Sequence, residues 1–234
     1  MKISSINNQL IKDTVKLHKK RNRDERNQFV MEGYHLYEEA QKHGNIKTIF
    51  TTDETIIGDK VIYVTDQVLE KISQTKKPQG VLCICEKINK TDITDKVLIL
   101  EQVQDPGNLG TLLRSALGFG FNTVVLDNTC DLYNEKVIRA TQGNIFKLNI
   151  IEQNTLEFIH QNQDFKYYGT AMNGETIDNI EQHDKIALIL GNEGAGVSKE
   201  VLRNTYKNIS INTNVESLNV GVAGSIIMHE ISRG

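Results

Sequence analysis

Short apolar runs and stripes of apolar residues at helical spacing alternate along the C-terminal part of the chain. The apolar runs have the length of buried strands, and they lie at 97–100, 123–126, 145–150, 167–171, 186–190 and 207–211. Helical spacing occupies the segments at 108–118, 134–141, 155–162 and 198–204, and a long final helix is expected from Ser217. Strands that alternate with helices predict an α/β fold with a mostly parallel sheet, covered by helices on both faces.

The first 90 residues show a more mixed pattern. We expect a basic helix at 7–21, a short strand at 29–31, a helix that ends at Gly44, and strands near 46–51, 61–65 and 80–85. The stretch that follows, 86–95, is polar and has no apolar period. We therefore predict a small α/β domain at 1–90, a linker at 91–96 and a larger α/β domain at 97–234.

Positive charge is concentrated in the N-terminal part, although the net charge of all 234 residues is only −3. Residues 1–90 contain 16 Lys and Arg against 12 Asp and Glu, a net charge of +4, and the remainder has a net charge of −7. The excess lies in the basic segment, residues 12–26, which includes Lys19, Lys20, Arg21, Arg23 and Arg26. Such a segment is typical of a surface that binds nucleic-acid phosphates, but a solvated helix face explains it equally well.

The remaining composition favours a cytoplasmic protein. The first residues lack the apolar core of a signal peptide, and no stretch approaches the roughly 20 apolar residues that cross a bilayer. Cys83, Cys85 and Cys130 form no C-x-x-C pair, and the first two alternate within an apolar run. We interpret them as buried thiols in a reducing compartment and expect no metal site.

Residues 105–120 combine a stripe of leucines with two glycines that flank an arginine. On a helical wheel Gly110, Thr111, Arg114 and Gly118 fall on a face separate from the leucines. Glycine inside a helix costs about 1 kcal/mol relative to alanine. This face therefore indicates the close approach of a large ligand to Arg114, with a surface arginine beside a tight helix contact as the alternative.

Two further segments are rich in small residues. Residues 188–198 predict a strand that runs into a glycine-rich turn, which suits a nucleotide or phosphate ligand. The glycine order G-x-x-G-x-G fails the dinucleotide fingerprint, which weakens a Rossmann-type oxidoreductase, and Val197 stands where a P-loop has lysine. The last segment begins at Ser217, which we expect to cap the final helix, and Gly221 and Gly224 favour a close helix contact there.

Together these three segments resemble the SpoU/TrmH family of RNA ribose 2′-O-methyltransferases, within the SPOUT class, over about 140 residues from Val97 onward. The segments similar to the three family motifs are Asp105 to Arg114, Leu190 to Gly194, and Ser217 to Val220. Residues 134–143 fit the family pattern between the first two motifs. Residues 29–33 and the helix after them are similar to the small RNA substrate-binding domain that many members carry.

The resemblance implies a C-terminal trefoil knot, with S-adenosylmethionine bound by the knot loops. The corresponding cofactor positions are Thr170, Ala171, Gly191, Ile211 and Leu218. It also implies a homodimer whose sites are completed across a knot-to-knot interface. One departure concerns the strand that usually ends Ile-Pro-Met in the family. Here it reads Ile-Asn-Thr at 211–213, a change that bears on the rigidity of this loop.

The implied reaction needs a ribose hydroxyl that loses its proton as it attacks the methyl group. The family mechanism assigns the base role to the arginine that matches Arg114. Because an arginine side chain stays protonated in proteins, we favour a role in orienting the adjacent phosphate and stabilising the developing alkoxide. The residues expected to surround it with hydrogen bonds are Asn108, Glu193, Ser217 and Asn219.

The expected substrate is 23S ribosomal RNA, because family members that act on tRNA commonly lack a substrate domain of this kind. Residues 1–90 are expected to bind this RNA. One alternative is a tRNA 2′-O-methyltransferase, and another is a non-catalytic RNA-binding protein that keeps the fold. Cofactor binding without a methylated product would indicate the non-catalytic protein.

Overall fold

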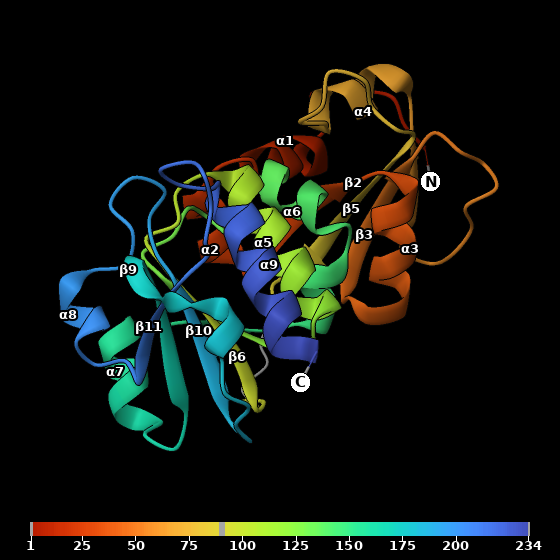
Figure 1. Ribbon diagram of the computed structural model, residues 1–234. Helices are drawn as coiled ribbons and strands as arrows, with labels where there is room; N and C mark the ends of the chain where they lie inside the picture. Colours follow the sequence, from red (N-terminus) through yellow and green to blue (C-terminus); the bar gives the residue numbers. More distant parts are fainter. Residues whose placement is uncertain (1, 89–91, 234) are drawn as a thin grey trace. The chain divides into compact units, whose positions relative to one another are not determined.

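The computed structural model describes residues 2–88 and 92–233, which form two compact units (Figure 1). The first unit contains the described residues up to 88 together with 133–146, and the second contains the described residues of 92–132 and 147–233. The predicted linker lies where the chain passes between the units, and its residue 91 is outside the described residues. The segment 133–146 packs in the first unit, although the sequence pattern assigns it to the larger domain.

A five-stranded sheet with the strand order β1-β4-β3-β5-β2 forms the centre of the first unit. Its strands are β1 (Lys2–Ile3), β2 (Gln28–Glu32), β3 (Ile46–Thr51), β4 (Val61–Val64) and β5 (Val81–Glu86). Helices α1 (Gln9–Lys16) and α4 (Asp66–Ile72) pack on one face, around Phe50 and Leu82. Helices α3 (Tyr34–His43) and α6 (Glu135–Thr141) contact β2, so a helix distant in sequence completes this unit.

The basic segment forms two helices rather than the single helix expected at 7–21. Helix α1 ends at Lys16, and α2 (Lys20–Arg26) follows after a short break. Arg23 explains the break, because its Nη1 donates to the backbone oxygens of Leu17 and His18, both at 2.8 Å. These bonds satisfy carbonyls that a continuing helix would use. Only 5% of Arg23 is exposed, so its prediction as an RNA phosphate contact is wrong.

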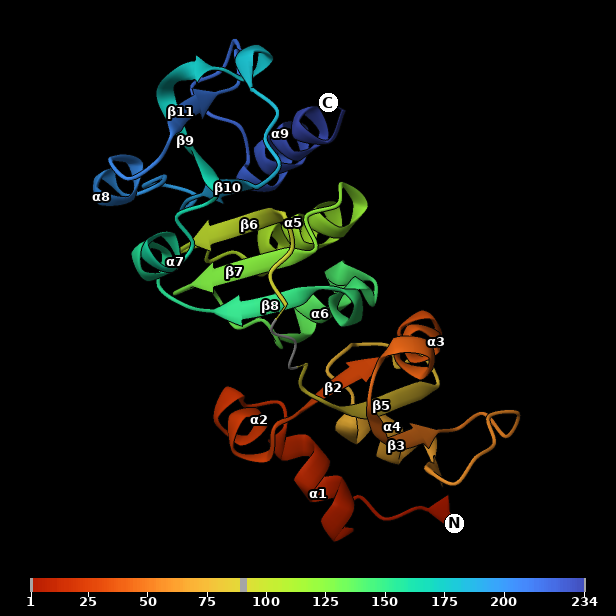
Figure 2. The ribbon, with the colours of Figure 1, turned by 90° about the horizontal axis from the view of Figure 1, so that it is seen from below.

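The second unit is built on a six-stranded sheet with the order β11-β9-β10-β6-β7-β8, which Figure 2 shows side by side. Its strands are β6 (Lys96–Glu101), β7 (Thr123–Asp127), β8 (Asn149–Glu152), β9 (Lys166–Thr176), β10 (Ile186–Leu190) and β11 (Lys207–Ser210). Every neighbouring pair is parallel, so the predicted mostly parallel sheet is confirmed.

Helices cover both faces of this sheet, as the alternation of strands and helices predicts. Val97, Ile99 and Ile189 face a core that contains residues of α7 (Thr155–Gln161) and α8 (Lys199–Leu202). Helices α5 (Pro106–Gly118) and α9 (Val220–Arg233) contact each other, and α9 also contacts β10. A Cβ at Gly224 of α9 would lie 2.4 Å from a Leu190 methyl carbon, so the glycine permits this close packing.

Two element boundaries differ from those expected. Residues 145–150 form not one strand but the short helix η1 (Asn144–Lys147) followed by β8. The final helix starts at Val220 rather than Ser217, because Asn219 caps it: its Oδ1 accepts from the backbone N–H groups of Gly221 at 2.9 Å and Val222 at 3.3 Å. The short helix η2 (Ile177–Asn179) lies between β9 and β10.

Candidate active site

The first two motif segments meet where β6 and β10 end. These parallel strands pair Leu100 with Leu190, so the segments that follow them emerge at the same edge of the sheet. Asp105 then caps α5, accepting from the backbone N–H of Asn108 at 2.8 Å, and Pro106 occupies the first helical turn. The carboxyl edge of a parallel sheet is where ligands bind in open α/β folds.

Glu193 joins these two segments through its carboxylate. One oxygen accepts from the backbone N–H of Asp105 at 2.9 Å and from Nδ2 of Asn108 at 3.1 Å, and the other accepts from the backbone N–H of Gln104 at 3.2 Å. Partial burial opposes ionisation, yet the hydrogen bonds outweigh it, so the pKa of Glu193 lies below its usual range. The carboxylate is thus held in place by donors from a segment about 90 residues away.

Asn108 extends this arrangement to the third motif. Its Oδ1 accepts from Nδ2 of Asn219 at 2.9 Å, while Asn219 caps α9 as described above. Glu193, Asn108 and Asn219 therefore form one continuous chain of hydrogen bonds, which we call the polar network. Ser217 is exposed and precedes the helix by three residues, so its predicted role as the cap is wrong.

Asn192, which the sequence analysis missed, shapes the loop that carries Glu193. Its Nδ2 donates to the backbone oxygen of Gln102 at 2.9 Å, and its Oδ1 accepts from the N–H groups of Gly194 at 2.9 Å and Ala195 at 3.0 Å. An asparagine directly before a glycine-rich turn is a recognised signal for such side-chain to backbone bonds. Gly191 is required as well, since a Cβ there would lie 2.1 Å from the Gly196 carbonyl carbon.

Arg114 stands apart from the polar network. It follows Asn108 by six residues in α5, which is about 9 Å along the helix axis. Its side chain is exposed and, within residues 2–88 and 92–233, makes no hydrogen bond or ion pair. Gly118 borders open space, as expected, but Gly110 is buried, so only part of the predicted bare face is open. The guanidinium is therefore available to a ligand.

The residues implied to hold the cofactor lie within β9, directly after β10 and β11, and in the loop before α9. Gly191 directly follows β10, and Ile211 directly follows β11. In the pairing of β9 with β11, Gly169 is opposite Asn208 and Glu175 is opposite Ile209. Because Asn208 and Ile209 are adjacent, residues 170–174 of β9 have no partner in β11 and form a bulge. Thr170 and Ala171 lie in this bulge, where Oγ1 of Thr170 donates to the Ile189 oxygen at 3.1 Å.

This set of groups suits an adenosine. It offers backbone donors and acceptors in the β9 bulge and directly after β10 and β11, and Ile211 and Leu218 add partly exposed aliphatic side chains for the face of a flat base. Gly191 keeps its position free of a side chain, because the Gly196 backbone lies against it. The residues therefore fit S-adenosylmethionine, whose adenosine is neutral.

The basic segment is largely paired with its own acidic residues. Lys20 contacts Asp24 at 3.3 Å and Arg21 contacts Glu25 at 2.8 Å, both one helical turn apart, and Arg26 contacts Asp13 at 3.1 Å. Hydrogen bonds from Lys16, Gln9 and Arg26 hold the pKa of Asp13 well below its usual range. Lys19 is exposed at the cap position of α2. These residues lie in the first unit, so the structure divides the predicted site residues between the two units.

The cysteines have the properties of unreactive thiols. Burial raises the pKa of Cys83 to about 12, and Cys85 beside it is also buried. Cys130 is only half-buried, unlike the expected buried thiol, and its pKa is raised to about 11 by burial and by Glu193, Asp105 and Asp131 nearby. Within the described residues, no group of His, Cys, Asp or Glu is arranged to hold a metal ion. No helix in the described part of the chain has the length and apolar character to span a membrane.

The fold agrees with comparisons to known proteins. The SpoU rRNA Methylase family matches residues 95–229, and the MRM3-like substrate binding domain matches residues 8–83. The chain belongs to the SpoU rRNA methylase family. This result confirms the family expected from the three motifs and the prediction that the chain is an RNA methyltransferase.

Individual relatives extend this similarity over the full length. The chain is 38% identical to the 23S rRNA (guanosine(2553)-2′-O)-methyltransferase RlmP of Bacillus subtilis, over 98% of each chain. It is 31% identical to the 23S rRNA (guanosine-2′-O-)-methyltransferase RlmB of Coxiella burnetii, over 76% of this chain and 78% of the relative. An AdoMet-bound rRNA methyltransferase from Sinorhizobium meliloti has a TM-score of 0.90 at 28% identity, over 100% of this chain and 97% of that one.

Proposed function

We propose that this chain methylates a ribose 2′-hydroxyl of 23S ribosomal RNA in the cytoplasm, with S-adenosylmethionine as the methyl donor. The single observation that carries the proposal is the polar network, because it ties three distant motifs together and includes Asn108 of α5, the helix that also carries the available guanidinium of Arg114. The names of the two relatives support the 23S substrate.

The direct test adds the protein and S-adenosylmethionine with a labelled methyl group to total RNA from a strain that lacks this protein. We expect one new 2′-O-methyl group in 23S ribosomal RNA, located by mapping the label. A label found in tRNA instead would show that the substrate is tRNA and not 23S ribosomal RNA. Cofactor binding without any labelled RNA would indicate the non-catalytic alternative.

We assign the cofactor to Thr170, Ala171, Gly191, Ile211 and Leu218. Backbone groups in the β9 bulge and directly after β10 and β11 would bind the adenosine, and the two aliphatic residues would exclude water from one face of the base. When bound, S-adenosylmethionine supplies a methyl group made electrophilic by the sulfonium. Asn212, which replaces the proline of the family pattern, leaves the backbone of Ile211 available for this contact.

Arg114 would act on the nucleotide that is methylated. Its exposed guanidinium can hold the phosphate next to the target ribose and stabilise the negative charge that grows on the 2′-oxygen as its proton passes to a solvent water. The polar network of Asn108, Glu193 and Asn219 would hold the surrounding loops in fixed positions, because its hydrogen bonds join one motif to another. Ser217, exposed before α9, would contact the substrate or cofactor directly.

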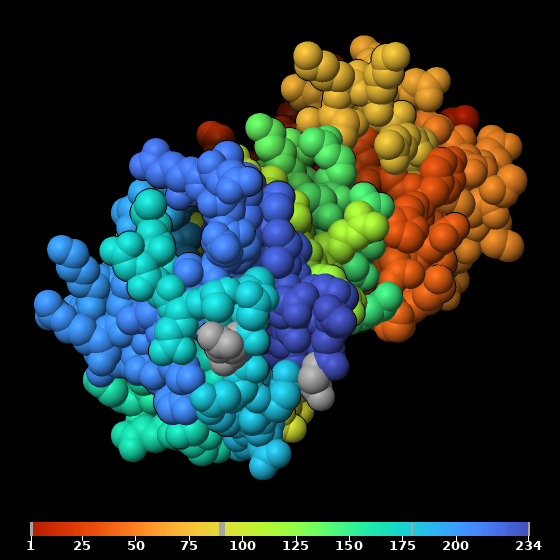
Figure 3. Space-filling view, viewed as in Figure 1, coloured from red at the N-terminus to blue at the C-terminus, as the bar shows by residue number. Residues whose placement is uncertain are grey.

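We further propose that the C-terminal part is a trefoil knot and that two copies of the chain form a homodimer through it. Val222 and Ile226, one turn apart in α9, are 49% and 37% exposed, and Met172 and Val215 are 72% and 56% exposed. The C-terminal helix forms part of the molecular surface in Figure 3. Sedimentation should give a dimer, and a fully active monomer at micromolar concentration would contradict the proposal.

The N-terminal domain is proposed to capture the RNA. We retain the expected domain at 1–90 and the methyltransferase domain at 97–234 as functional divisions of the sequence. Lys19, Lys20, Arg21 and Arg26 remain candidates for phosphate contacts. Lys20, Arg21 and Arg26 would have to exchange their acidic partners for phosphate. Surface ion pairs of this kind contribute about 0–1 kcal/mol, so the exchange costs little.

A further inference from the structure

Gln102, the first residue after β6, has a backbone conformation that glutamine rarely adopts. Its φ angle is 58°, in the left-handed region where the Cβ of an ordinary residue crowds the following carbonyl oxygen. A glycine would take the same conformation without this strain. Strained residues of this kind cluster at active sites and ligand contacts.

The hydrogen bonds of its backbone explain why the chain turns at Gln102. Its N–H donates to the backbone oxygen of Asp127, the last residue of β7, at 2.7 Å. Its own backbone oxygen accepts from Nδ2 of Asn192, in the loop after β10, at 2.9 Å. Gln102 thus joins β6 to the segments on both sides of that strand. These contacts use only the backbone, so a glycine would make them equally well.

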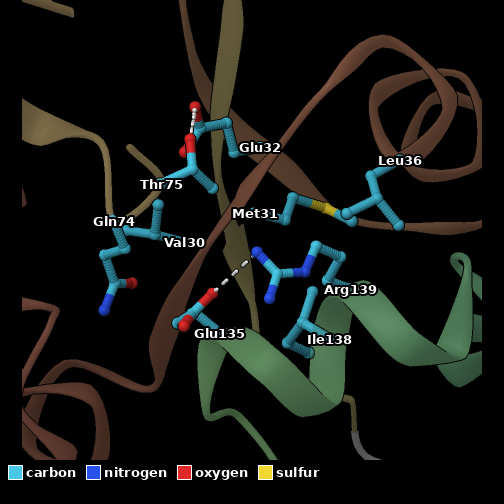
Figure 4. Close-up of a pocket in the computed structure, with 9 residues that line it drawn as sticks. All are labelled: Val30, Met31, Glu32, Leu36, Gln74, Thr75, Glu135, Ile138 and Arg139. Atoms are coloured by element: carbon cyan, nitrogen blue, oxygen red, sulfur yellow. Dashed lines mark hydrogen bonds and ion pairs between the residues drawn. The ribbon is translucent and has the colours of Figure 1, made fainter. Parts of the chain in front are cut away.

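Among the described residues, three others that are not glycine have a positive φ, and each has a local explanation. Asn27 and Asn128 are asparagines, which adopt this conformation more readily than most residues. Gln142, with a φ of 51°, ends α6, the helix that carries Arg139 in Figure 4. Its Nε2 donates to the backbone oxygen of Arg139 at 2.9 Å, so its side chain completes the end of its own helix.

The side chain of Gln102 has no such local role. It is exposed and makes no hydrogen bond within residues 2–88 and 92–233. Its amide therefore keeps an NH₂ donor group and an acceptor oxygen available to a ligand. The structure of the protein explains the backbone of Gln102 but not the choice of a long polar side chain.

Gln102 lies on the side of the active site that leads to Arg114. Because Leu100 pairs with Leu190, Gln102 and Asn192 each follow the last pair of these strands by two residues. The cofactor residues belong to β9 and to the segments after β10 and β11, on one side of β6. The chain after β6 instead runs through Gln102 into α5, which carries Arg114. This position favours a contact with the substrate over one with the cofactor.

We propose that the side chain of Gln102 forms hydrogen bonds with the substrate RNA beside the target ribose, an inference that rests on the proposed function. A neutral amide that both donates and accepts matches ribose hydroxyls and base edges, which offer donors and acceptors. Phosphates, in contrast, attract cations such as Arg114. Gln102 would thus add an uncharged contact to the phosphate contact assigned to Arg114, and the strain of its backbone is the cost of placing this amide.

The test compares the full-length wild-type protein with Gln102→Gly and Gln102→Met in equilibrium binding to 23S ribosomal RNA from a strain that lacks this protein. Glycine removes the amide and the strain, whereas methionine keeps a long side chain without strong hydrogen-bonding groups. Each variant should bind this RNA about 3- to 10-fold more weakly, the size of one or two neutral hydrogen bonds. The slope of log affinity against log salt should stay unchanged, because no phosphate contact is lost.

Stability and cofactor binding separate this role from a structural one. Gln102→Gly should leave the midpoint of thermal unfolding unchanged or raise it by at most about 4 °C, because relief of strain is partly offset by the freedom of glycine in the unfolded chain. The affinity for S-adenosylmethionine, measured by calorimetry, should not change. Gln142→Gly is the matched control, because it replaces the same residue type in the same backbone conformation in the first unit, and it should leave RNA affinity unchanged.

Wild-type RNA affinity in both Gln102 variants would overturn the inference. A loss confined to Gln102→Gly would overturn it as well, since the backbone and not the amide would then be responsible. An equal loss of affinity for S-adenosylmethionine would overturn it in favour of a cofactor contact. Because equilibrium binding requires no turnover, the two proposals fail separately. If the wild-type protein transfers no methyl group to this RNA, the proposed function fails, whereas weaker RNA binding by both variants still supports the contact.

Discussion

The polar network of the second unit and the basic segment of the first unit use their polar groups in opposite ways. Glu193, Asn108 and Asn219 form a chain of hydrogen bonds across about 110 residues of sequence, and their partners include backbone groups of the segment after β6 and of the first turn of α9. The charged groups of α2 mostly bind neighbours within the same helix, such as Arg21 with Glu25. The first arrangement fixes a geometry, whereas the second mainly neutralises charge.

This difference separates residues that a substrate can recruit from residues that it cannot. A side chain in the polar network already has its partners, so replacing it disturbs the loops around it. A surface cation paired one turn away can exchange its carboxylate for a phosphate at low cost. Arg114 belongs to neither group, because it is exposed and makes no hydrogen bond or ion pair among the described residues.

The largest effect is expected for Arg114. Arg114→Ala should reduce turnover by about 10²-fold or more, the scale of losing one electrostatic donor in a transition state. Arg114→Lys should restore little, since it lacks the planar fork. Methyl transfer under saturating cofactor measures the effect, and calorimetry should give nearly unchanged cofactor affinity. Near wild-type turnover of Arg114→Ala would show that the active site is assigned to the wrong residue.

Arg23 should affect folding rather than RNA binding. Arg23→Ala removes a buried guanidinium and leaves the carbonyl groups of Leu17 and His18 without this donor, so we expect a loss of about 2–3 kcal/mol in the free energy of unfolding. Urea denaturation measures it. The exposed Lys19→Ala serves as the control and should change stability by less than about 0.5 kcal/mol. A stable Arg23→Ala protein with a reduced salt dependence of RNA binding would restore the original assignment.

Glu193→Gln tests whether the polar network needs a carboxylate. The amide places an N–H donor against the backbone N–H of Gln104 or Asp105, and water can replace part of the lost bonding because these groups are exposed, so we expect a loss of about 0.5–1.5 kcal/mol at neutral pH. The pKa of Glu193 in the folded protein lies below its value in the unfolded chain. The greater stability of the wild-type protein is therefore fully present above about pH 4.3, and it is lost as the pH falls through the folded-state pKa. Thermal unfolding of both proteins between about pH 3 and 7 measures the difference in stability between them. A constant difference across the range would argue against an ionised Glu193.

The smallest effect is expected for the paired cations. Replacing Lys20 and Arg21 together by alanine should weaken RNA binding modestly and lower the slope of log affinity against log salt by at most about two units, one for each phosphate contact. Cofactor affinity should not change. Identical slopes for the double variant and the wild-type protein would leave α2 as a solvated helix.

Most of the second unit could be predicted from sequence, because its signals are local. The apolar runs at 97–100, 123–126 and 186–190 are strands, and the leucine stripe after Asp105 is α5. The family motifs also indicated Asn108, Glu193 and Asn219 as neighbours, and the structure links these three through side-chain hydrogen bonds. What the motifs could not indicate is which of two polar residues caps α9, since Ser217 and Asn219 are both good caps.

The failures concern residues whose role depends on a distant partner. In the sequence Arg23 looks like any other cation of an exposed basic helix. Only the turn between α1 and α2, which the sequence does not indicate, shows that it is buried. Helix α6 has an ordinary amphipathic pattern, and nothing in that pattern states that its apolar side contacts β2. Asn192 could have been found, because an asparagine before Gly194 in a tight turn is a local signal.

The placement of 133–146 in the first unit has a consequence for how the chain can be divided. Phe29 of β2 lies 4.7 Å from Tyr133 and 6.2 Å from Phe146, ring centre to ring centre, so these rings share one core. A protease nick near residues 92–96 would therefore leave two fragments held together without a peptide bond. A gene shortened by its first 90 codons would encode a protein that has lost the partner for Ile138, Tyr133 and Phe146 and presents these apolar side chains to water. The substrate domain is continuous in the sequence comparison but not in the folded molecule.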